Sequence, residues 1–262
     1  MRYAVCAFAV LIGGASAAFA ELKTEIIDYK YGDAALEGYL AYDDAFAGKR
    51  PGVLVAHEWW GHNAYARKRA EQLASLGYVA FALDMYGKGV EAKDATEAAE
   101  KASVFKKDRL LMRARAMAGL DVLRRLPKVD ADNLAAIGYC FGGTTVLELA
   151  RGGGDLKGVV SFHGGLDTPD PADPKKFRAK VLALAGADDP FVPKEQVAAF
   201  EDEMKKAKVD YKVISYPGAV HAFTNPAAGD DPKKGAAYNK EADEKSWEEM
   251  KTFFGRIFPK AK

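Results

Sequence analysis

Short apolar runs recur along the chain, and segments with helical periodicity separate them. The runs are typical of strands that are covered on both faces, and they span residues 51–56, 78–83, 133–139, 156–162, 180–185 and 210–216. Two earlier segments, 25–29 and 36–42, instead alternate polar with apolar residues around Gly32-Asp33. This alternation predicts an antiparallel pair at a sheet edge. The pattern therefore predicts eight strands, the first two antiparallel.

The segments between these strands carry apolar residues at helical spacing. Helices are predicted at residues 64–76, 91–104, 107–125, 144–150, 193–206 and 236–257. Because strands and helices alternate, we expect an α/β fold in which helices cover both faces of a mostly parallel, eight-stranded sheet. The ligand site of such a sheet lies at the carboxyl ends of its strands, so the loops that follow the strands are the places to search.

The first twenty residues have the pattern of a secretory signal peptide. Arg2 precedes an apolar run over residues 4–12, and Ala18-Phe19-Ala20 is typical of a cleavage site. The run is too short to span a bilayer, which argues against the alternative of an N-terminal anchor. We therefore expect export, to a bacterial periplasm. Residues 21–262 are expected to form one domain, since no repeat or flexible linker divides them.

The charge balance and the cysteine count narrow the classes of partner. The chain has 38 basic and 37 acidic residues, which are interspersed, so neither nucleic acid nor an anionic membrane is expected as a partner. The oligomeric state is left open, with a monomer favoured. Without the signal peptide one cysteine remains, Cys140, so no intramolecular disulfide can form. An unpaired thiol is a liability in an oxidising compartment, which suggests that this sulfur is used.

The segment around Cys140 predicts a strand, a tight turn and a helix with the thiol at the apex. Its sequence, Gly138-Tyr139-Cys140-Phe141-Gly142-Gly143, has small residues on both sides of the thiol. The pattern is that of the nucleophile elbow of α/β-hydrolases, G-x-S-x-G, with Cys in place of Ser. The alternative interpretation is that Cys140 is a small buried hydrophobic residue.

A thiol nucleophile requires a base that raises its thiolate fraction and an acid that orients the base. The candidates for the base are His57, His62, His163 and His221. In α/β-hydrolases the order is nucleophile, acid, histidine, and His221 alone follows an acid that itself ends a strand after the elbow. That acid is Asp188 or Asp189; both fit the loop, and the other would be a turn or cap residue.

An acyl-transfer site also requires two backbone N–H groups that face the developing oxyanion. One is expected from Phe141, which follows the thiol, and the other from Trp59, which lies in the loop after residues 53–56. With Trp60 and Phe223, these aromatic side chains are expected to wall a pocket for an unsaturated or aromatic acyl group; simple packing of the two Trp residues is the alternative. No metal or cofactor is expected, because the histidines lie in separate loops and no second mature cysteine is present.

Together these segments resemble the dienelactone hydrolase (carboxymethylenebutenolidase) family of α/β-hydrolases. The resemblance covers most of the mature chain and rests on residues 57–63, 84–86, 138–143, 189–193 and 218–223. It implies the α/β-hydrolase fold and a lactone or ester hydrolase. The family's acid lies two positions before Phe-Val-Pro, which selects Asp189 over Asp188. The family also has a buried glutamate, here Glu58, thought to keep the thiol uncharged at rest and to accept its proton when substrate binds.

Two departures concern the recognition of the substrate. The family's best-studied enzymes bind the substrate carboxylate with two arginines, and this chain has Lys88 and Asn225 at the matching positions. Lysine lacks the bidentate geometry and asparagine lacks the charge, so hydrolysis of lactones or esters in general is expected more than that of an anionic dienelactone. The predicted substrate-binding residues are Lys88, Trp60, Tyr86, Phe223 and Asn225.

The sequence thus predicts an exported cysteine hydrolase for a small-molecule ester or lactone. Cys140, Asp189, His221 and Glu58 are the predicted catalytic residues, and the acyl group would pass through a thioester on Cys140. A binding protein of the same fold that lacks turnover is one alternative. Acyl transfer in place of hydrolysis is another, because it would use the same residues.

Overall fold

A computed structural model describes residues 21–173 and 175–258, and the predicted signal peptide lies outside them. The strands are β1 (Leu22–Tyr31), β2 (Ala34–Asp43), β3 (Arg50–Ala56), β4 (Val79–Leu83), β5 (Val129–Tyr139), β6 (Gly158–Phe162), β7 (Lys180–Gly186) and β8 (Tyr211–Tyr216). The helices are α1 (Ala64–Ser75), α2 (Ala95–Lys107), α3 (Arg109–Arg125), α4 (Phe141–Arg151), α5 (Lys194–Lys206) and α6 (Lys240–Ile257), with two 3₁₀ turns, η1 (Pro226–Ala228) and η2 (Pro232–Lys234). None of the helices in the described ranges is long and apolar enough to cross a membrane.

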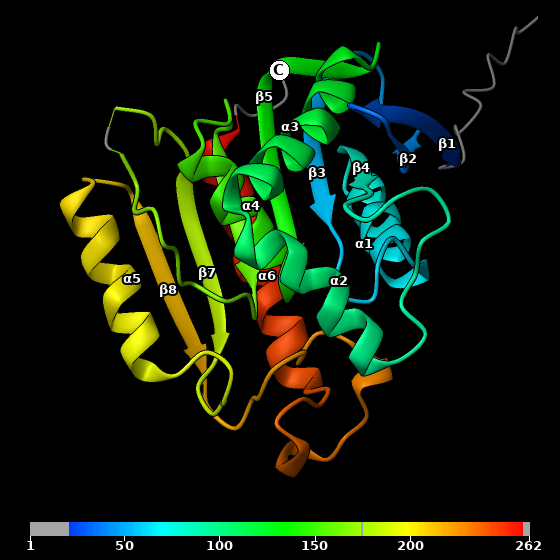
Figure 1. The fold of residues 1–262 in the computed structure, drawn as a ribbon. Coiled ribbons are helices and arrows are strands. Elements are labelled where there is room, and N and C mark those ends of the chain that lie inside the picture. Colours follow the sequence, from blue (N-terminus) through cyan, green and yellow to red (C-terminus); the bar gives the residue numbers. More distant parts are fainter. Residues whose placement is uncertain (1–20, 174, 259–262) are drawn as a thin grey trace, which may run out of the picture.

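All eight strands lie in one sheet, in the order β1-β2-β4-β3-β5-β6-β7-β8. β1 pairs antiparallel with β2 and β2 antiparallel with β4, whereas the remaining pairs are parallel. The prediction of a mostly parallel, eight-stranded sheet with an antiparallel start is therefore confirmed. The parallel strands end at one edge of the sheet, so the loops after β3, β5, β7 and β8 converge there (Figure 1).

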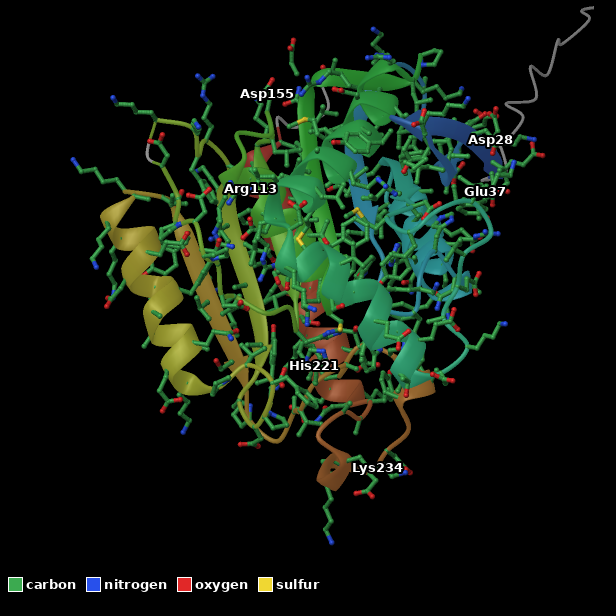
Figure 2. The ribbon with its side chains drawn as sticks, viewed as in Figure 1. Asp28, Glu37, Arg113, Asp155, His221 and Lys234 are labelled. Carbon is green, nitrogen blue, oxygen red and sulfur yellow. The ribbon has the colours of Figure 1, made fainter. Side chains whose placement is uncertain are left out.

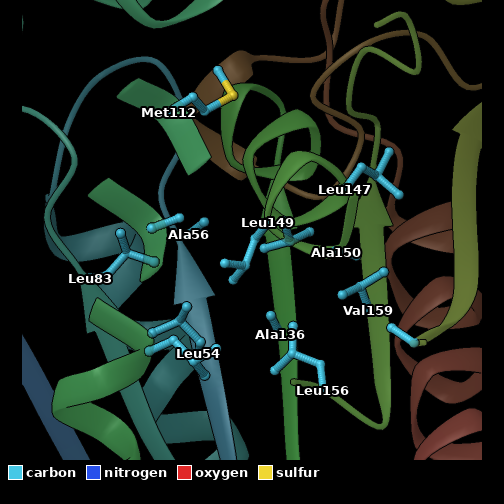
Figure 3. Close-up of a cluster of buried hydrophobic side chains, with 14 of the residues drawn as sticks. Leu54, Ala56, Leu83, Met112, Ala136, Leu147, Leu149, Ala150, Leu156 and Val159 are labelled. Carbon is cyan, nitrogen blue, oxygen red and sulfur yellow. The ribbon is translucent and has the colours of Figure 1, made fainter. Parts of the chain in front are cut away.

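Helices cover both faces of the sheet, as predicted. Figure 1 shows α3 and α4 in front of the sheet and α6 behind it. The buried side chains of α2 to α5 form one hydrophobic cluster with one face of the strands, and those of α1 and α6 form a second cluster with the other face. The first cluster is drawn in Figure 3, where Leu54 and Ala136 from the sheet face Leu149 and Ala150 of α4. Strands buried on both faces explain the continuous apolar runs.

Two helices begin four residues later than the periodicity predicts. α2 begins at Ala95 because the side chain of Asp94 caps it, accepting a hydrogen bond from the amide of Glu97 at 2.9 Å. The preceding residues are held in an extended segment, where Glu91 forms a β-bridge with Gly61. α6 likewise begins at Lys240, after its cap Asn239. Periodicity locates a helix, but the side-chain cap determines its first residue.

The turn between β5 and α4 depends on two glycines that touch backbone atoms. A Cβ atom at Gly138 would lie 2.0 Å from the carbonyl oxygen of Gly142, and one at Gly142 would lie 2.1 Å from the carbonyl oxygen of Ala56. Both distances are far shorter than any van der Waals contact. Because the obstructing atoms belong to the backbone, no side-chain movement can make room. The glycines therefore let α4 lie directly against the end of β3.

We expect Gly142→Ala to lower the free energy of unfolding by about 3 kcal/mol or more, because overpacking against a rigid backbone forces the turn to shift. Urea unfolding followed by circular dichroism measures this change. Gly255→Ala is the matched control: no atom lies within 4 Å of its Cβ position in α6, and Ala in a helix should stabilise the protein by about 0.5–1 kcal/mol. Equal effects of the two substitutions would contradict the role of the contact.

Candidate active site

Cys140 lies at the apex of the turn with a backbone conformation that is unfavourable for a residue with a side chain. Its φ is 54° and its ψ is −116°. Such conformations cost about 1–3 kcal/mol and persist where the surroundings enforce them. Here the amide of Cys140 donates to the carbonyl oxygen of Phe162 at 3.0 Å and to Nδ1 of His163 at 3.1 Å. The side chain is thereby held beyond the end of the sheet, where the thiol is half-buried.

Three of the sequence-predicted side chains form one line of hydrogen bonds. Nε2 of His221 lies 3.0 Å from Sγ of Cys140, and its Nδ1 lies 2.8 Å from Oδ2 of Asp189. Asp189 is buried in the loop after β7, and His221 lies in the loop after β8. Asp188 is exposed and accepts a hydrogen bond from the amide of Gly218 at 2.9 Å. Asp189 is therefore the carboxylate that contacts the imidazole.

His221 differs from the other three histidines in its electrostatic surroundings. Burial disfavours its charged form, but the interactions with the sulfur of Cys140 and the carboxylate of Asp189 outweigh burial and raise its pKa to about 10. Burial lowers the pKa of His57 and His163, and it lowers the pKa of His62 to about 3. His221 is thus the histidine whose surroundings favour a proton, which is what a general acid in contact with Cys140 requires.

His163 contacts both Cys140 and His221, a role that the sequence reasoning did not assign. It is fully buried, and its ring packs edge-to-face on that of His221 with 5.3 Å between the ring centroids. Because its Nδ1 accepts the hydrogen bond from Cys140, its Nε2 carries the proton and donates to Oγ1 of Thr224 at 2.7 Å. The neutral ring therefore supports the elbow. The sequence held one signal for this role of His163: it lies in Phe162-His163-Gly164-Gly165, directly after a strand.

The hydrogen bonds of His163 continue into a buried network between α1 and α6. Oγ1 of Thr224 lies 2.6 Å from the hydroxyl of Tyr65. The guanidinium of Arg69 donates to that hydroxyl at 3.2 Å, to the carbonyl oxygen of Thr224 at 2.8 Å and to Oδ1 of Asp243 at 2.6 Å. These residues are far apart in the sequence, so the network fixes the loop after β8, which carries His221, to two helices.

Glu58 is buried at the end of β3 and is held by Asn225. Nδ2 of Asn225 donates to Oε2 of Glu58 at 2.6 Å, and Oδ1 of Asn225 accepts from the amide of Ala227 at 2.9 Å, which fixes the orientation of the amide group. Burial raises the pKa of Glu58 from 4.5 to about 7, although the hydrogen bond and the charge of His221 oppose the rise. The sequence reasoning expected Asn225 to bind substrate; the structure instead places its amide group on Glu58.

The two backbone amides predicted to face an oxyanion are available. Phe141 is the first residue of α4, where N–H groups have no partner within the helix and the helix dipole favours negative charge. Within residues 21–173 and 175–258, neither the Phe141 nor the Trp59 amide donates a hydrogen bond. The loop of Trp59 is held by the hydroxyl of Tyr86, which donates to its carbonyl oxygen at 3.0 Å. The arrangement leaves two donors next to the thiol-bearing turn and the end of β3.

The aromatic side chains predicted to wall a pocket differ in their burial. Trp59 and Trp60 are half-buried and pack edge-to-face, and Tyr86 is also half-buried. Phe141 and Phe223, by contrast, are at most 1% exposed. The ring of Phe141 packs on His57 and Tyr86. Phe223 packs on His163, which places it behind the site. The expectation that these two phenylalanines wall a pocket is therefore wrong, because both rings fill the core.

Lys88 does not join the site. Its ammonium group lies 2.5 Å from Oδ2 of Asp28 on β1 and 3.9 Å from Oε2 of Glu37 on β2. Figure 2 shows these two acidic residues at the upper right, well apart from His221 below the centre of the molecule. The sequence placed Lys88 in a strand-end loop, but the antiparallel strands β1 and β2 supply carboxylates that draw its side chain away.

A metal centre finds no support in the described part of the chain. No group of three or more His, Cys, Asp or Glu side chains among those residues could hold a metal ion.

The raised pKa of Glu58 generates a prediction about stability. Its pKa is higher in the folded protein than the ordinary 4.5, so the folded protein is stabilised by the protonated form of Glu58. This contribution to the free energy of unfolding is complete below pH 4.5 and is lost as the pH rises through about 7. Glu58→Gln cannot ionise. We expect its free energy of unfolding, relative to wild type, to rise by up to about 3 kcal/mol between pH 4.5 and 8.

Urea unfolding at a series of pH values measures this difference. Glu100→Gln, which removes an exposed carboxylate on α2, controls for the general loss of a negative charge. If the free energies of unfolding of Glu58→Gln and wild type differed by the same amount at every pH, Glu58 would not be a buried group with a raised pKa.

Comparison with known proteins agrees with this geometry. The family model of the dienelactone hydrolase family matches residues 36–258. A putative carboxymethylenebutenolidase of Synechocystis is 29% identical over 258 residues, covering 89% of this chain and 97% of that protein. A solved structure described as m3DLH is 42% identical with a TM-score of 0.87, and the match covers 91% of this chain and 99% of that one.

A second solved structure is a dienelactone hydrolase-like promiscuous phosphotriesterase from metagenomic libraries. It is 40% identical with a TM-score of 0.86, and the match again covers 91% of this chain and 99% of that one. The family match includes the loops after β3, β5, β7 and β8, which carry the site. The chain belongs to the dienelactone hydrolase family, and it is an α/β-hydrolase of small-molecule esters or lactones.

Proposed function

We propose that this protein is an exported, cysteine-dependent hydrolase of uncharged esters or lactones that forms an acyl-thioester on Cys140. The observation that carries the proposal is the line of hydrogen bonds from Asp189 through His221 to the sulfur of Cys140. Nucleophile, base and orienting acid at these distances are the arrangement that acyl transfer requires. Export rests on the signal-like residues 1–20 alone, and N-terminal sequencing of protein recovered from a periplasmic fraction tests it.

In the acylation step the proton of the Cys140 thiol passes to Nε2 of His221, and the sulfur attacks the carbonyl carbon of the substrate. The carbonyl oxygen takes up the negative charge and is held by the amides of Phe141 and Trp59. The bond from carbon to the leaving oxygen then breaks, and His221 gives its proton to that oxygen as the alcohol departs. Asp189 stabilises the imidazolium through its hydrogen bond to Nδ1. The product of this step is the acyl group on the sulfur.

In the deacylation step a water molecule attacks the thioester carbon. His221, now neutral, takes a proton from the water, and the same two amides hold the oxyanion. The carbon–sulfur bond breaks, the carboxylic acid leaves and the sulfur recovers the proton from His221. Glu58, whose pKa is about 7, is proposed to exchange a proton with the thiol when substrate arrives. This last role rests on the family resemblance together with the burial of Glu58.

The charges around the site favour an uncharged acyl group. Glu58 and Asp189 are buried carboxyl groups beside the reacting atoms. Asp189 is already paired with the imidazole of His221, and two other cationic side chains are engaged elsewhere: Lys88 by Asp28, and Arg69 by Asp243. A carboxylate on the acyl group would therefore find neither Lys88 nor Arg69 free to pair with it. The unengaged amides would also suit a phosphoryl oxygen. One similar solved structure is described as a promiscuous phosphotriesterase, so neutral phosphotriesters are a second class of substrate to assay.

Replacement of the thiol tests the proposal. Cys140→Ala should abolish hydrolysis of p-nitrophenyl acetate and of a neutral lactone, while its thermal unfolding stays cooperative. Rapid mixing of wild type with the ester should give a burst of p-nitrophenolate, and mass spectrometry should find acetate on Cys140. Equal activity of wild type and Cys140→Ala would refute the proposal. A protein that binds the ester without a burst would support a binding role, and ester formation with an added alcohol would support acyl transfer.

Asp188 and Asp189 supply an internal control for the same assay. Asp189→Asn should lower kcat by about 10³–10⁴-fold, because the imidazole loses the partner that orients and stabilises it. Asp188→Asn changes the adjacent, exposed residue, and its kcat should stay close to that of wild type. Comparable losses in both variants would mean that the loop, and not the hydrogen bond to His221, determines activity.

The engagement of Lys88 and Arg69 elsewhere predicts weaker turnover of anionic acyl groups. Wild type should show a lower kcat/KM for mono-p-nitrophenyl succinate than for p-nitrophenyl acetate. Lys88→Ala should change the ratio of the two values by less than about twofold, since its ammonium group is paired with Asp28. A selective loss on the succinate ester in this variant would show that Lys88 recognises the substrate carboxylate.

A further inference from the structure

Phe191 is a large apolar side chain that is 60% exposed, two residues beyond Asp189. Single exposed apolar residues are common at protein surfaces, and exposure alone carries no argument. Phe191 differs in what it touches: its ring packs edge-to-face on the imidazole of His221, with 5.3 Å between the ring centroids and 80° between the planes. An exposed aromatic ring in contact with the proposed acid and base is placed to meet the substrate.

The ring is held in place from several directions. The amide of Phe191 donates to Oδ1 of Asp189 at 2.8 Å, so the same carboxylate that holds His221 also fixes the backbone of Phe191. On another side the ring approaches Gly235, where a Cβ atom would lie 3.5 Å from it. The carbonyl oxygen of Gly235 in turn accepts a hydrogen bond from the amide of His221 at 3.1 Å. Phe191 is therefore part of a preorganised surface around His221.

The direction of the chemistry identifies the part of the substrate that this surface faces. In the proposed acylation, Nε2 of His221 protonates the leaving oxygen, so this oxygen lies within about 3 Å of the imidazole. The group attached to that oxygen must extend past the side chains that flank His221. His163 also contacts the imidazole but is fully buried, whereas Phe191 is open to solvent. The acyl part of the substrate lies instead beside the amides of Phe141 and Trp59.

We propose that Phe191 determines specificity for the leaving group and forms a subsite for an aromatic or other large apolar alcohol. This inference rests on the proposed function, because it takes the leaving oxygen to be protonated by His221. An aromatic leaving group gains contact with the exposed ring in the Michaelis complex and in the transition state for acylation, but it has left before deacylation. Its effect is therefore confined to one half of the reaction.

The test compares two acetate esters whose alcohols have similar acidity, benzyl acetate and ethyl acetate. Both yield the same acetyl-enzyme, so they differ only before the alcohol departs. In Phe191→Ala the ratio of kcat/KM for benzyl acetate to that for ethyl acetate should fall by about three- to tenfold. Phe191→Trp should retain most of the preference. Leu110→Ala, which truncates an apolar side chain that is 73% exposed on α3, should leave the ratio unchanged.

The breakdown of the acetyl-enzyme is the internal reference. If Phe191→Ala slowed this step and lowered kcat/KM equally for both esters, Phe191 would act by positioning His221 and the proposal would be overturned. An unchanged ratio would overturn it as well. Cys140→Ala distinguishes these outcomes from a failure of the proposed function. Residual hydrolysis in Cys140→Ala would refute the thioester. The ratio of kcat/KM for the two esters in Phe191→Ala would still report on the subsite.

Discussion

The close approach of α4 to the end of β3 is the constraint on which the site depends. A helix can follow a parallel strand this tightly only if the backbone at the turn lacks side chains, and Gly138 and Gly142 meet that condition. Cys140, at the apex of the turn midway between the two glycines, has a positive φ. This conformation directs the thiol away from the sheet and leaves the first amide of α4 without a partner inside the helix. One steric constraint thus places the half-buried sulfur beyond the sheet and also provides an oxyanion donor.

Burial then assigns different protonation states to groups of the same kind. It disfavours charge on His57, His163 and Glu58, so the two histidines are kept neutral and Glu58 holds its proton up to about pH 7. His221 is less completely buried and lies between the sulfur of Cys140 and the carboxylate of Asp189, which favour its charged form, so its pKa rises. The site therefore contains a hydrogen-bond acceptor in His163 and a proton donor in His221, with their rings in contact.

Much of the fold was predictable because the physical signals for it are local. Continuous apolar runs reveal strands that are covered on both faces, and the alternation at residues 25–29 and 36–42 reveals the antiparallel edge. The starts of α2 and α6 were less predictable, since caps on Asp94 and Asn239 determine them. The site was predictable to the extent that it follows strand ends in a fixed order. The predictions failed where a side chain could point in either of two directions. Phe223 points into the core instead of lining a pocket, and Lys88 points toward Asp28 instead of the site.

The sequence by itself determined the class of fold, the elbow and the loops that carry Cys140, the acid and His221, because apolar runs, helical periodicity and tight turns are properties of short segments. Tertiary structure decided which of two adjacent carboxylates reaches His221, that His163 supports the elbow, and that Asn225 binds Glu58. It also placed Phe191 on the proposed acid and base. Each of these contacts joins residues from separate loops, and their geometry exists only after the sheet brings the loops together.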